Sequence, residues 1–219
     1  MTWLEYSRRL KQKDLVPIPW MVAMALQADG WYLRSDIIWA KPNPMPESVT
    51  DRPTKSHEYL FLLAKSRSYY YDADAIKERA THAGKVVTLG EKSLSKAQAS
   101  GANVLRSGNA LCDSVVVAEG RNRRTVWTIS TQPFPGAHFA VFPRALVEPC
   151  ILAGSRLGDL VLDPFAGAGT VGVVCRKHSR RFVGIEINPE YAAMARGRLG
   201  GYKPTDDPDD GTPDMWSAA

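Results

Sequence analysis

The sequence predicts an α/β fold that contains a mostly parallel sheet. The chain has 219 residues, of which 44% are hydrophobic and 23% charged, so it can bury the core of one large domain. Two short apolar runs, residues 160–162 and 182–185, have the composition of buried strands. A glycine-rich loop and a helical segment over residues 171–178 separate them, and two strands joined by one helix make a right-handed βαβ unit.

The first third of the chain predicts one helix and two strands. Apolar residues recur at helical spacing over residues 14–26, and Gly30 marks the end of this helix. Residues 31–39 are rich in aromatic and β-branched side chains, which favours a strand, and three prolines within residues 41–46 make the next loop rigid. Residues 58–65 form a nearly continuous apolar run, which is typical of a strand buried on both faces.

The middle of the chain differs in composition from the rest. Residues 80–126 contain no aromatic residue and many small or basic ones, so they can contribute little to a core. We interpret this stretch as an inserted module or a long mobile loop. Order is expected to return with a helix beyond Pro143 and another that Asn188 caps and Pro189 begins. The last 19 residues, rich in Gly, Pro and Asp, are expected to be a disordered acidic tail.

Composition also indicates where the protein works. No apolar stretch approaches the roughly 18 residues that span a bilayer, and the N-terminus lacks the order of a secretory signal. The cysteines, Cys112, Cys150 and Cys175, lie far apart, and no set of His, Cys, Asp and Glu has metal-ligand spacing. We therefore expect a cytoplasmic protein with no membrane segment, no disulfide framework and no metal.

The charge of the chain favours a polyanionic partner. The formal net charge is +5, and five of the acidic residues are aspartates in the last 19 residues. The rest of the chain is therefore more basic than the total suggests. Nucleic acid suits such a charge, although many basic enzymes bind none.

The glycine-rich loop carries the strongest chemical signal. Residues 163–172 read Asp-Pro-Phe-Ala-Gly-Ala-Gly-Thr-Val-Gly and contain a GxGxxG pattern directly after a strand and at the start of a helix. Glycines there let the backbone approach a ligand. Glu186, 19 residues after Gly167, can accept hydrogen bonds from both hydroxyls of a ribose. The joint spacing predicts a site for a nucleoside-bearing cofactor.

Several cofactors fit this pattern to different degrees. A nucleoside triphosphate is disfavoured because no Lys-Ser or Lys-Thr follows the glycines. A nicotinamide dinucleotide matches both the glycines and the acid, so an NAD-dependent oxidoreductase stays open as an alternative. Asp163 argues against it, since a carboxylate beside the pocket repels a pyrophosphate but suits the sulfonium and ammonium groups of S-adenosylmethionine. The charge of Asp163 therefore favours the methyl donor.

Five segments of the chain form a set: residues 39–48, 52–59, 138–143, 163–170 and 184–191. In this order they resemble the DNA amino-methyltransferases, which methylate N6 of adenine or N4 of cytosine. The resemblance implies a Rossmann-like fold of the S-adenosylmethionine-dependent methyltransferases. It also implies the donor-binding residues, which are Asp163, Pro164, Phe165, Ala166, Gly167, Gly169 and Thr170 in the loop, Glu186 at the ribose, and His138 and Phe142 beside the methionine half.

The order of the segments resembles the permuted β class of these enzymes, in which a variable region separates the two halves. This implies a pocket-side half over residues 1–79, a target-recognition region over 80–126, a cofactor-binding half over 127–200 and the acidic tail over 201–219. Double-stranded DNA is then the expected partner. Its expected contacts are Lys41, Arg121, Arg123 and Arg124, and a solvated surface loop is the simpler alternative.

The resemblance stops at the catalytic motif. The family holds the extruded base with an Asp, Ser or Asn followed by Pro-Pro and an aromatic residue, and this chain has no Pro-Pro pair. We therefore assign no catalytic residue. We expect a sheet that is incomplete at the N-terminus, which a homodimer or a missing N-terminal segment would cover. A non-catalytic DNA-binding module that retains the cofactor fold is a second alternative, and the choice between adenine and cytosine stays open.

Two pocket-side features have simpler interpretations. His57 is next to Glu58, but adjacent strand residues point to opposite faces, so an acid–base pair is not expected. Trp3, Trp20 and Trp31 are expected to pack in the core or at its edge, and stacking of one of them on the base is the alternative.

Overall fold

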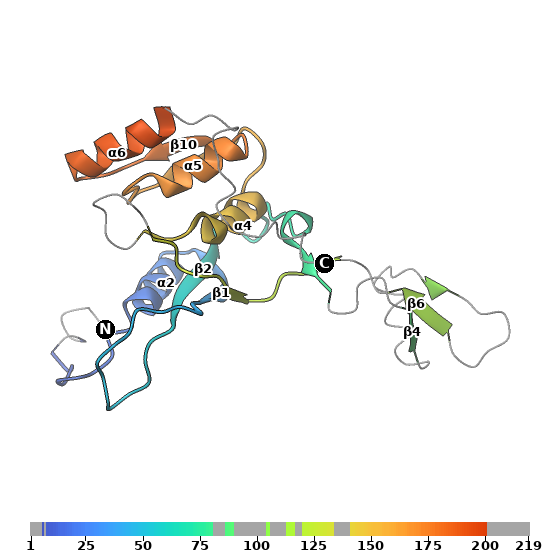
Figure 1. Cartoon of the computed structure of the whole chain (residues 1–219), viewed down its shortest axis with the longest axis horizontal. Coiled ribbons are helices and arrows are strands. Elements are labelled where there is room, and N and C mark those ends of the chain that lie inside the picture. Colours follow the sequence, from blue (N-terminus) through green and yellow to red (C-terminus); the bar gives the residue numbers. More distant parts are fainter. Residues whose placement is uncertain are drawn as a thin grey trace.

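The fold is α/β and consists of two strand-and-helix units that helix α4 (Arg144–Gly154) joins (Figure 1). The computed structural model describes residue 6 and residues 8–80, 86–89, 104–105, 113–116, 120–133 and 141–200. Most of the first unit precedes the insert, residues 80–126, but its third strand follows the insert, and the other unit follows α4. The expected α/β class is confirmed.

The first unit is a three-stranded sheet in the order β2-β1-β8, with a helix beside it. Its elements are α2 (Ile18–Ala28), β1 (Tyr32–Ala40), β2 (His57–Ala64) and β8 (Val126–Thr128). β1 pairs antiparallel with β2 and parallel with β8. The Lys41 N–H donates to the Ser56 carbonyl at 2.8 Å, so the proline-rich loop leaves and re-enters the sheet at one point.

The second unit is the βαβ unit that the sequence predicts, followed by one more helix. Its elements are β9 (Leu160–Asp163), α5 (Thr170–Lys177), β10 (Arg181–Gly184) and α6 (Pro189–Gly200). β9 and β10 pair in parallel, with Asp163 opposite Gly184. The Asn188 side-chain oxygen accepts the Glu190 N–H at 2.9 Å, as expected for the residue that caps α6. Both strands therefore end at one edge, where the loop and Glu186 meet.

The core has two parts, and α4 contributes to both. Leu146 packs with Trp39 and Trp127 of the first sheet. Val147 and Ile151 pack on the other part, which contains Val174 and Cys175 of α5. Each such aliphatic side chain contributes about 1.5–3 kcal/mol when it is fully buried. Helix α4 therefore provides much of the packing between the two units.

Strand pairing in the two units is mixed, with two parallel pairs and one antiparallel pair. β9–β10 and β1–β8 are parallel, but β1–β2, the longest ladder, is antiparallel. A parallel pair needs a crossover, usually a helix, and the loop over residues 41–56 contains none. β2 is also an edge strand with mostly half-buried side chains, so the expectation of burial on both faces was wrong.

The start of α2 is a second correction. The helix begins at Ile18 rather than at residue 14, with Pro17 as its N-cap. Pro17 and Pro19 fit only the first turn of a helix because neither has an N–H to donate. Among the described residues, no helix has the length and apolar character that crossing a membrane requires.

The insert contains strands of its own. β3 (Glu78–Arg79) pairs antiparallel with β7 (Gly120–Arg121) at its base. Figure 1 shows β4 and β6 well away from the two units. The second small sheet is antiparallel and consists of β4 (Val86–Leu89), β6 (Asp113–Val116) and β5 (Val104–Leu105). The inserted module stays a prediction because most of residues 80–126 lies outside the described residues, as does the whole tail over 201–219.

Candidate functional site

The glycine loop and the acid of the next strand contact each other directly. Glu186 accepts the N–H of Gly167 on Oε2 at 2.8 Å and the N–H of Asn188 on Oε1 at 2.9 Å. Each carboxylate oxygen has two lone pairs, so these two donors do not use up its acceptor capacity. The backbone bonds fix the orientation of the carboxylate beside the loop.

Asp163 lies at the same edge of the sheet as Glu186. It is the last residue of β9, and its Oδ1 accepts the N–H of Phe165 at 3.0 Å. Its backbone carbonyl accepts the N–H of Ile185 at 2.9 Å, one residue before Glu186. The two acids that the sequence places at one site are thus brought together by neighbouring strand ends.

The conformation of the loop requires glycine at Gly169 in particular. This residue caps α5 with a φ of 78°, in the left-handed region. A Cβ there would lie 3.0 Å from the Cβ of Ala195 in α6. Gly167 also has a positive φ, 51°. The glycine pattern therefore reflects backbone conformation and close packing together.

The remaining loop residues divide into exposed and buried ones. Phe165 is 87% exposed, and Ile187, which the glycine pattern does not include, is 99% exposed. Ala166 and Thr170 are buried, so their side chains support the loop from behind. Exposed apolar side chains next to two acids are typical of a site that a flat, partly apolar ligand covers.

Two of the three remaining predicted donor residues are described by the structure, and both are exposed. Pro164 is exposed on the loop, and Phe142 is 38% exposed just before α4. His138 lies outside the described residues. Contact of Phe142 and His138 with the methionine half of the donor stays a prediction.

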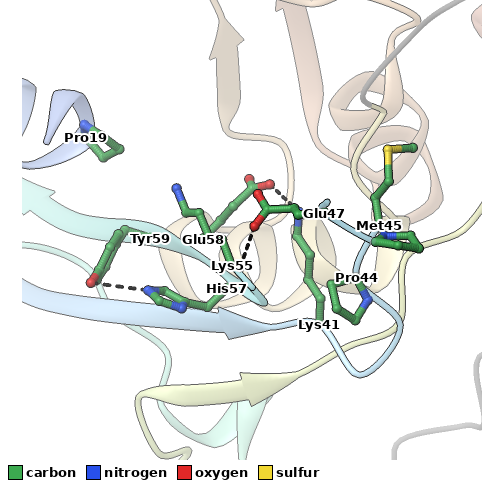
Figure 2. Close-up of a pocket in the computed structure, with 10 residues that line it drawn as sticks. Pro19, Lys41, Pro44, Met45, Glu47, Lys55, His57, Glu58 and Tyr59 are labelled. Carbon is green, nitrogen blue, oxygen red and sulfur yellow. Dashed lines mark hydrogen bonds and ion pairs between the residues drawn. The ribbon is translucent and has the colours of Figure 1, made fainter. Parts of the chain in front are cut away.

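A second candidate site lies in the first unit. A cavity of about 440 Å³ opens between the start of α2, the proline-rich loop and the start of β2, as Figure 2 shows. Small-molecule sites have volumes of roughly 300–1,000 Å³, so this cavity can hold a nucleobase or a nucleoside. It is lined by Pro19, Lys41, Pro44, Met45, Pro46, Glu47, Lys55, His57, Glu58 and Tyr59.

Charged side chains form part of the cavity wall. Lys41 pairs with Glu58, and the Lys41 side chain is only 19% exposed. Glu47 accepts hydrogen bonds from the Arg52 side chain at 2.8 Å and from the Lys55 N–H at 3.1 Å. These two bonds lower the pKa of Glu47, so its carboxylate stays charged. The cavity thus offers both hydrogen-bond donors and acceptors.

His57 and Glu58 border the same cavity although their side chains have different partners. His57 Nε2 lies 3.4 Å from the hydroxyl of Tyr59, whereas Glu58 pairs with Lys41. The different partners agree with the prediction that the two side chains point to opposite faces of the strand. Both nevertheless border one cavity because they lie at the start of β2, where the cavity reaches both faces. Trp20 packs edge-on against Tyr59, with ring centroids 5.6 Å apart, so it supports the wall as the packing interpretation predicts.

The expected DNA contacts at the base of the insert take part in intramolecular pairs. Arg121 and Arg124 both donate from Nε to Oε1 of Glu78, at 2.7 and 2.6 Å. Burial raises the pKa of Glu78, but the hydrogen bonds from the two arginines lower it below its usual value. The Arg123 guanidinium lies 4.6 Å from the centre of the Trp127 ring. Arg124, whose side chain is 69% exposed, is more accessible than Arg121, at 36%.

A glycine loop closed by an acid at the end of the adjacent strand defines the class of α/β domains that bind a nucleoside cofactor. Comparison with known proteins then gives the family. Residues 2–197 match the family described as DNA methylase, and the chain belongs to it. Family membership sets aside the alternative of an NAD-dependent oxidoreductase.

Close relatives are type II methyltransferases by name. M.Cfr9I of Citrobacter freundii is 52% identical over 192 residues, which cover 88% of this chain and 52% of that protein. M.SmaI of Serratia marcescens is 52% identical over 190 residues, with coverages of 87% and 54%. The chain therefore spans about half the length of these relatives.

Solved structures confirm the expected methyltransferase fold. The PvuII DNA methyltransferase, described as cytosine-N4-specific, has a TM-score of 0.58 at 19% identity, over 90% of this chain and 63% of that one. M1.HpyAVI in complex with SAM has a TM-score of 0.55 at 22% identity, over 85% and 71%. At such identities the likeness concerns the fold alone.

Proposed function

We propose that this chain is the donor-binding and base-pocket portion of an S-adenosylmethionine-dependent DNA amino-methyltransferase, which methylates N6 of adenine or N4 of cytosine. The observation that carries the proposal is the hydrogen bond that the Gly167 N–H donates to the Glu186 carboxylate. This bond lies at the edge of the β9–β10 sheet, where Asp163 ends the neighbouring strand. The relatives support the reaction, since two of them are named type II methyltransferases and M1.HpyAVI was solved with SAM.

The donor site is proposed to be built around two acids. S-adenosylmethionine supplies a methyl group on a positively charged sulfur. Glu186 is suited to accept the ribose hydroxyls, the charge of Asp163 favours the cationic half of the donor, and Phe165 and Ile187 offer apolar surface for its purine. The residues present therefore fit this donor. The proposed set is Asp163, Pro164, Phe165, Ala166, Gly167, Gly169, Thr170, Glu186, His138 and Phe142.

The cavity beside β2 is proposed to receive the extruded base. It lies where β1 ends, and one of its walls is the aromatic side chain of Tyr59. Lys41 and Glu58 provide a donor and an acceptor at the same place. A base extruded from the duplex is held by stacking on side chains and by hydrogen bonds to its edge. We assign no catalytic residue among the cavity-lining side chains.

Double-stranded DNA is the proposed substrate. We propose that Lys41, Arg121, Arg123 and Arg124 contact it, with residues 80–126 as the target-recognition region. The pairs with Glu78 support this arrangement because they hold Arg121 and Arg124 at the base of the insert. The parts before and after the insert, residues 1–79 and 127–200, are the proposed pocket-side and cofactor-binding halves, and residues 201–219 are the proposed acidic tail.

An apolar face of the donor-binding sheet supports a further partner. Four side chains of β9, β10 and the residue after it are between 45% and 59% exposed: Leu160, Leu162, Val183 and Ile185. Their neighbours Val161 and Phe182 face the core instead. Parallel sheets are normally covered on both faces. We propose that a second copy of the chain or a further segment of polypeptide covers this face. If the chain has the mass of a dimer in solution and Leu160→Lys has that of a monomer, the second copy is favoured.

Thermal unfolding with each cofactor tests the proposed function. The unfolding temperature should rise with S-adenosylmethionine and stay unchanged with NAD, because only a ligand of the native state stabilises it. The absence of any rise with S-adenosylmethionine would contradict the proposal. Transfer of radiolabelled methyl to unmethylated DNA then distinguishes a catalytic chain from a donor-binding module without catalysis.

A further inference from the structure

Helix α6 holds the glycine loop from behind through one arginine. Arg198, in the last turn of α6, donates from Nη1 to the Ala168 carbonyl at 2.6 Å and to Thr170 Oγ1 at 3.4 Å. Ala168 and Thr170 are only 3% and 5% exposed. Burial, more than the charge of Arg144, lowers the pKa of Arg198, yet a guanidinium stays charged at neutral pH. The bond to Ala168 is therefore a charge-assisted bond in a buried place.

The peptide between Ala168 and Gly169 is fixed at both ends. Its carbonyl accepts from Arg198, and its N–H, that of Gly169, donates to the Ala166 carbonyl at 2.8 Å. Without Arg198 the buried carbonyl would lose this partner, and the peptide could rotate. The orientation of this peptide determines the shape of the loop between the two glycines.

Other contacts of α6 act on the same stretch. Ala195 lies so close to Gly169 that a Cβ on the glycine would be 3.0 Å from the Ala195 Cβ. Just before α6 begins, Glu186 accepts the N–H of Gly167. One helix and the turn that leads into it therefore hold the loop at three consecutive residues, 167–169, and Arg198 holds the middle one.

We propose that Arg198 is a positioning residue for the donor, which it does not itself contact. It fixes the Ala168–Gly169 peptide so that the loop has its binding conformation before the donor arrives. This inference rests on the proposed function of the loop. A preformed loop binds its ligand more tightly because binding does not have to include the entropic cost of ordering the loop.

Calorimetric titration of S-adenosylmethionine into three folded variants tests this role. Arg198→Met should raise the Kd about tenfold, since one charged hydrogen bond to the loop is lost. Arg198→Lys keeps a charged donor and should recover most of the affinity. Arg196→Met, an exposed arginine of the same helix, is the matched control and should bind like the wild type. Arg198→Gln serves as the milder replacement where Arg198→Met does not fold, with a Kd several-fold above that of the wild type.

A purely structural role predicts a different pattern. It would lower the unfolding temperature of the Arg198 variants measured without S-adenosylmethionine. Below that temperature it would leave their Kd for S-adenosylmethionine within twofold of the wild-type value. This pattern would overturn the inference. Failure of the wild type to bind the donor would instead contradict the proposed function, so the two failures are distinguishable. Recovery by lysine together with weak binding by Arg198→Met or Arg198→Gln supports the positioning role.

Discussion

The second unit, with the proposed donor site, and the first unit, with the cavity beside β2, are held in shape by different kinds of contact. Backbone groups fix the donor loop, as in the bond from the Gly167 N–H to Glu186, and Gly169 packs against α6 without room for a side chain. Ion pairs between side chains form the cavity wall, as between Lys41 and Glu58. Partly exposed pairs contribute little individually and can exchange partners. We therefore expect the proposed donor site to be preformed and the proposed base pocket to adjust to its occupant.

The largest effect is expected from a change at Glu186, the acid of the proposed donor site. Glu186→Gln replaces one acceptor oxygen by an amide donor, which then faces the N–H of Gly167 or of Asn188. Hydrogen bonds to charged groups are worth about 1.5–3 kcal/mol each, so the affinity for S-adenosylmethionine should fall about a hundredfold. Isothermal titration calorimetry measures this change. Glu190→Gln, exposed in the first turn of α6, is the control, and a change below threefold at Glu186 would contradict a preformed site.

Close packing behind the loop gives the next largest effect. A Cβ at Gly172 would lie 2.7 Å from the ring of Phe182, and overpacking of this kind costs about 1–3 kcal/mol. Urea unfolding of Gly172→Ala should show this loss. Gly197→Ala in α6 has no atom within 4 Å of the added carbon and should gain about 0.5–1 kcal/mol. Equal stability changes in the two variants would mean that the packing is not as tight as the contacts indicate.

The pocket-side unit should respond in DNA binding rather than in donor binding. Tyr59→Leu removes an aromatic wall of the cavity, and stacking on a base is worth about 1–3 kcal/mol. Affinity for a duplex with a mismatched, easily extruded base should fall about tenfold in fluorescence polarisation, while the Kd for the donor stays unchanged. Tyr32→Leu alters an exposed tyrosine of β1 and serves as the control. A parallel loss of donor binding in Tyr59→Leu would show that the two sites are not separate.

The smallest effect concerns a pair that joins α4 to α5. Hydrogen bonding from His178 lowers the pKa of Glu148 below its usual 4.5, although burial opposes the shift. A lowered pKa stabilises the folded state above pH 4.5, and this stabilisation disappears as the pH falls through the folded pKa. Glu148→Gln should therefore cost about 1 kcal/mol at pH 7 and nothing well below pH 4. A cost that is independent of pH would assign the effect to packing instead.

The contact between the glycine loop and Glu186 could be predicted from sequence because both belong to one βαβ unit. A glycine pattern directly after a strand specifies a turn, and Glu186 follows at the spacing that one crossover helix sets. Side-chain packing such as that of Ala195 on Gly169 involves a later helix, so the sequence pattern alone did not reveal it. Arg198 was missed for the same reason.

The cavity of the first unit could not be predicted from any single segment. It combines Pro19, the loop after β1 and the start of β2, which come together only through the antiparallel pairing of β1 with β2. The sequence predicted the two strands but not how they pair. The signal that pointed there was the resemblance of residues 39–48 and 52–59 to segments of the family.

An amide NMR spectrum of the chain, titrated with S-adenosylmethionine, tests the central claim most directly. We predict the largest saturable shifts at the N–H groups of Gly167 and Asn188, which donate to Glu186, and little change on addition of NAD. Shifts that spare both amides, or an equal response to NAD, would contradict a donor site at this strand edge.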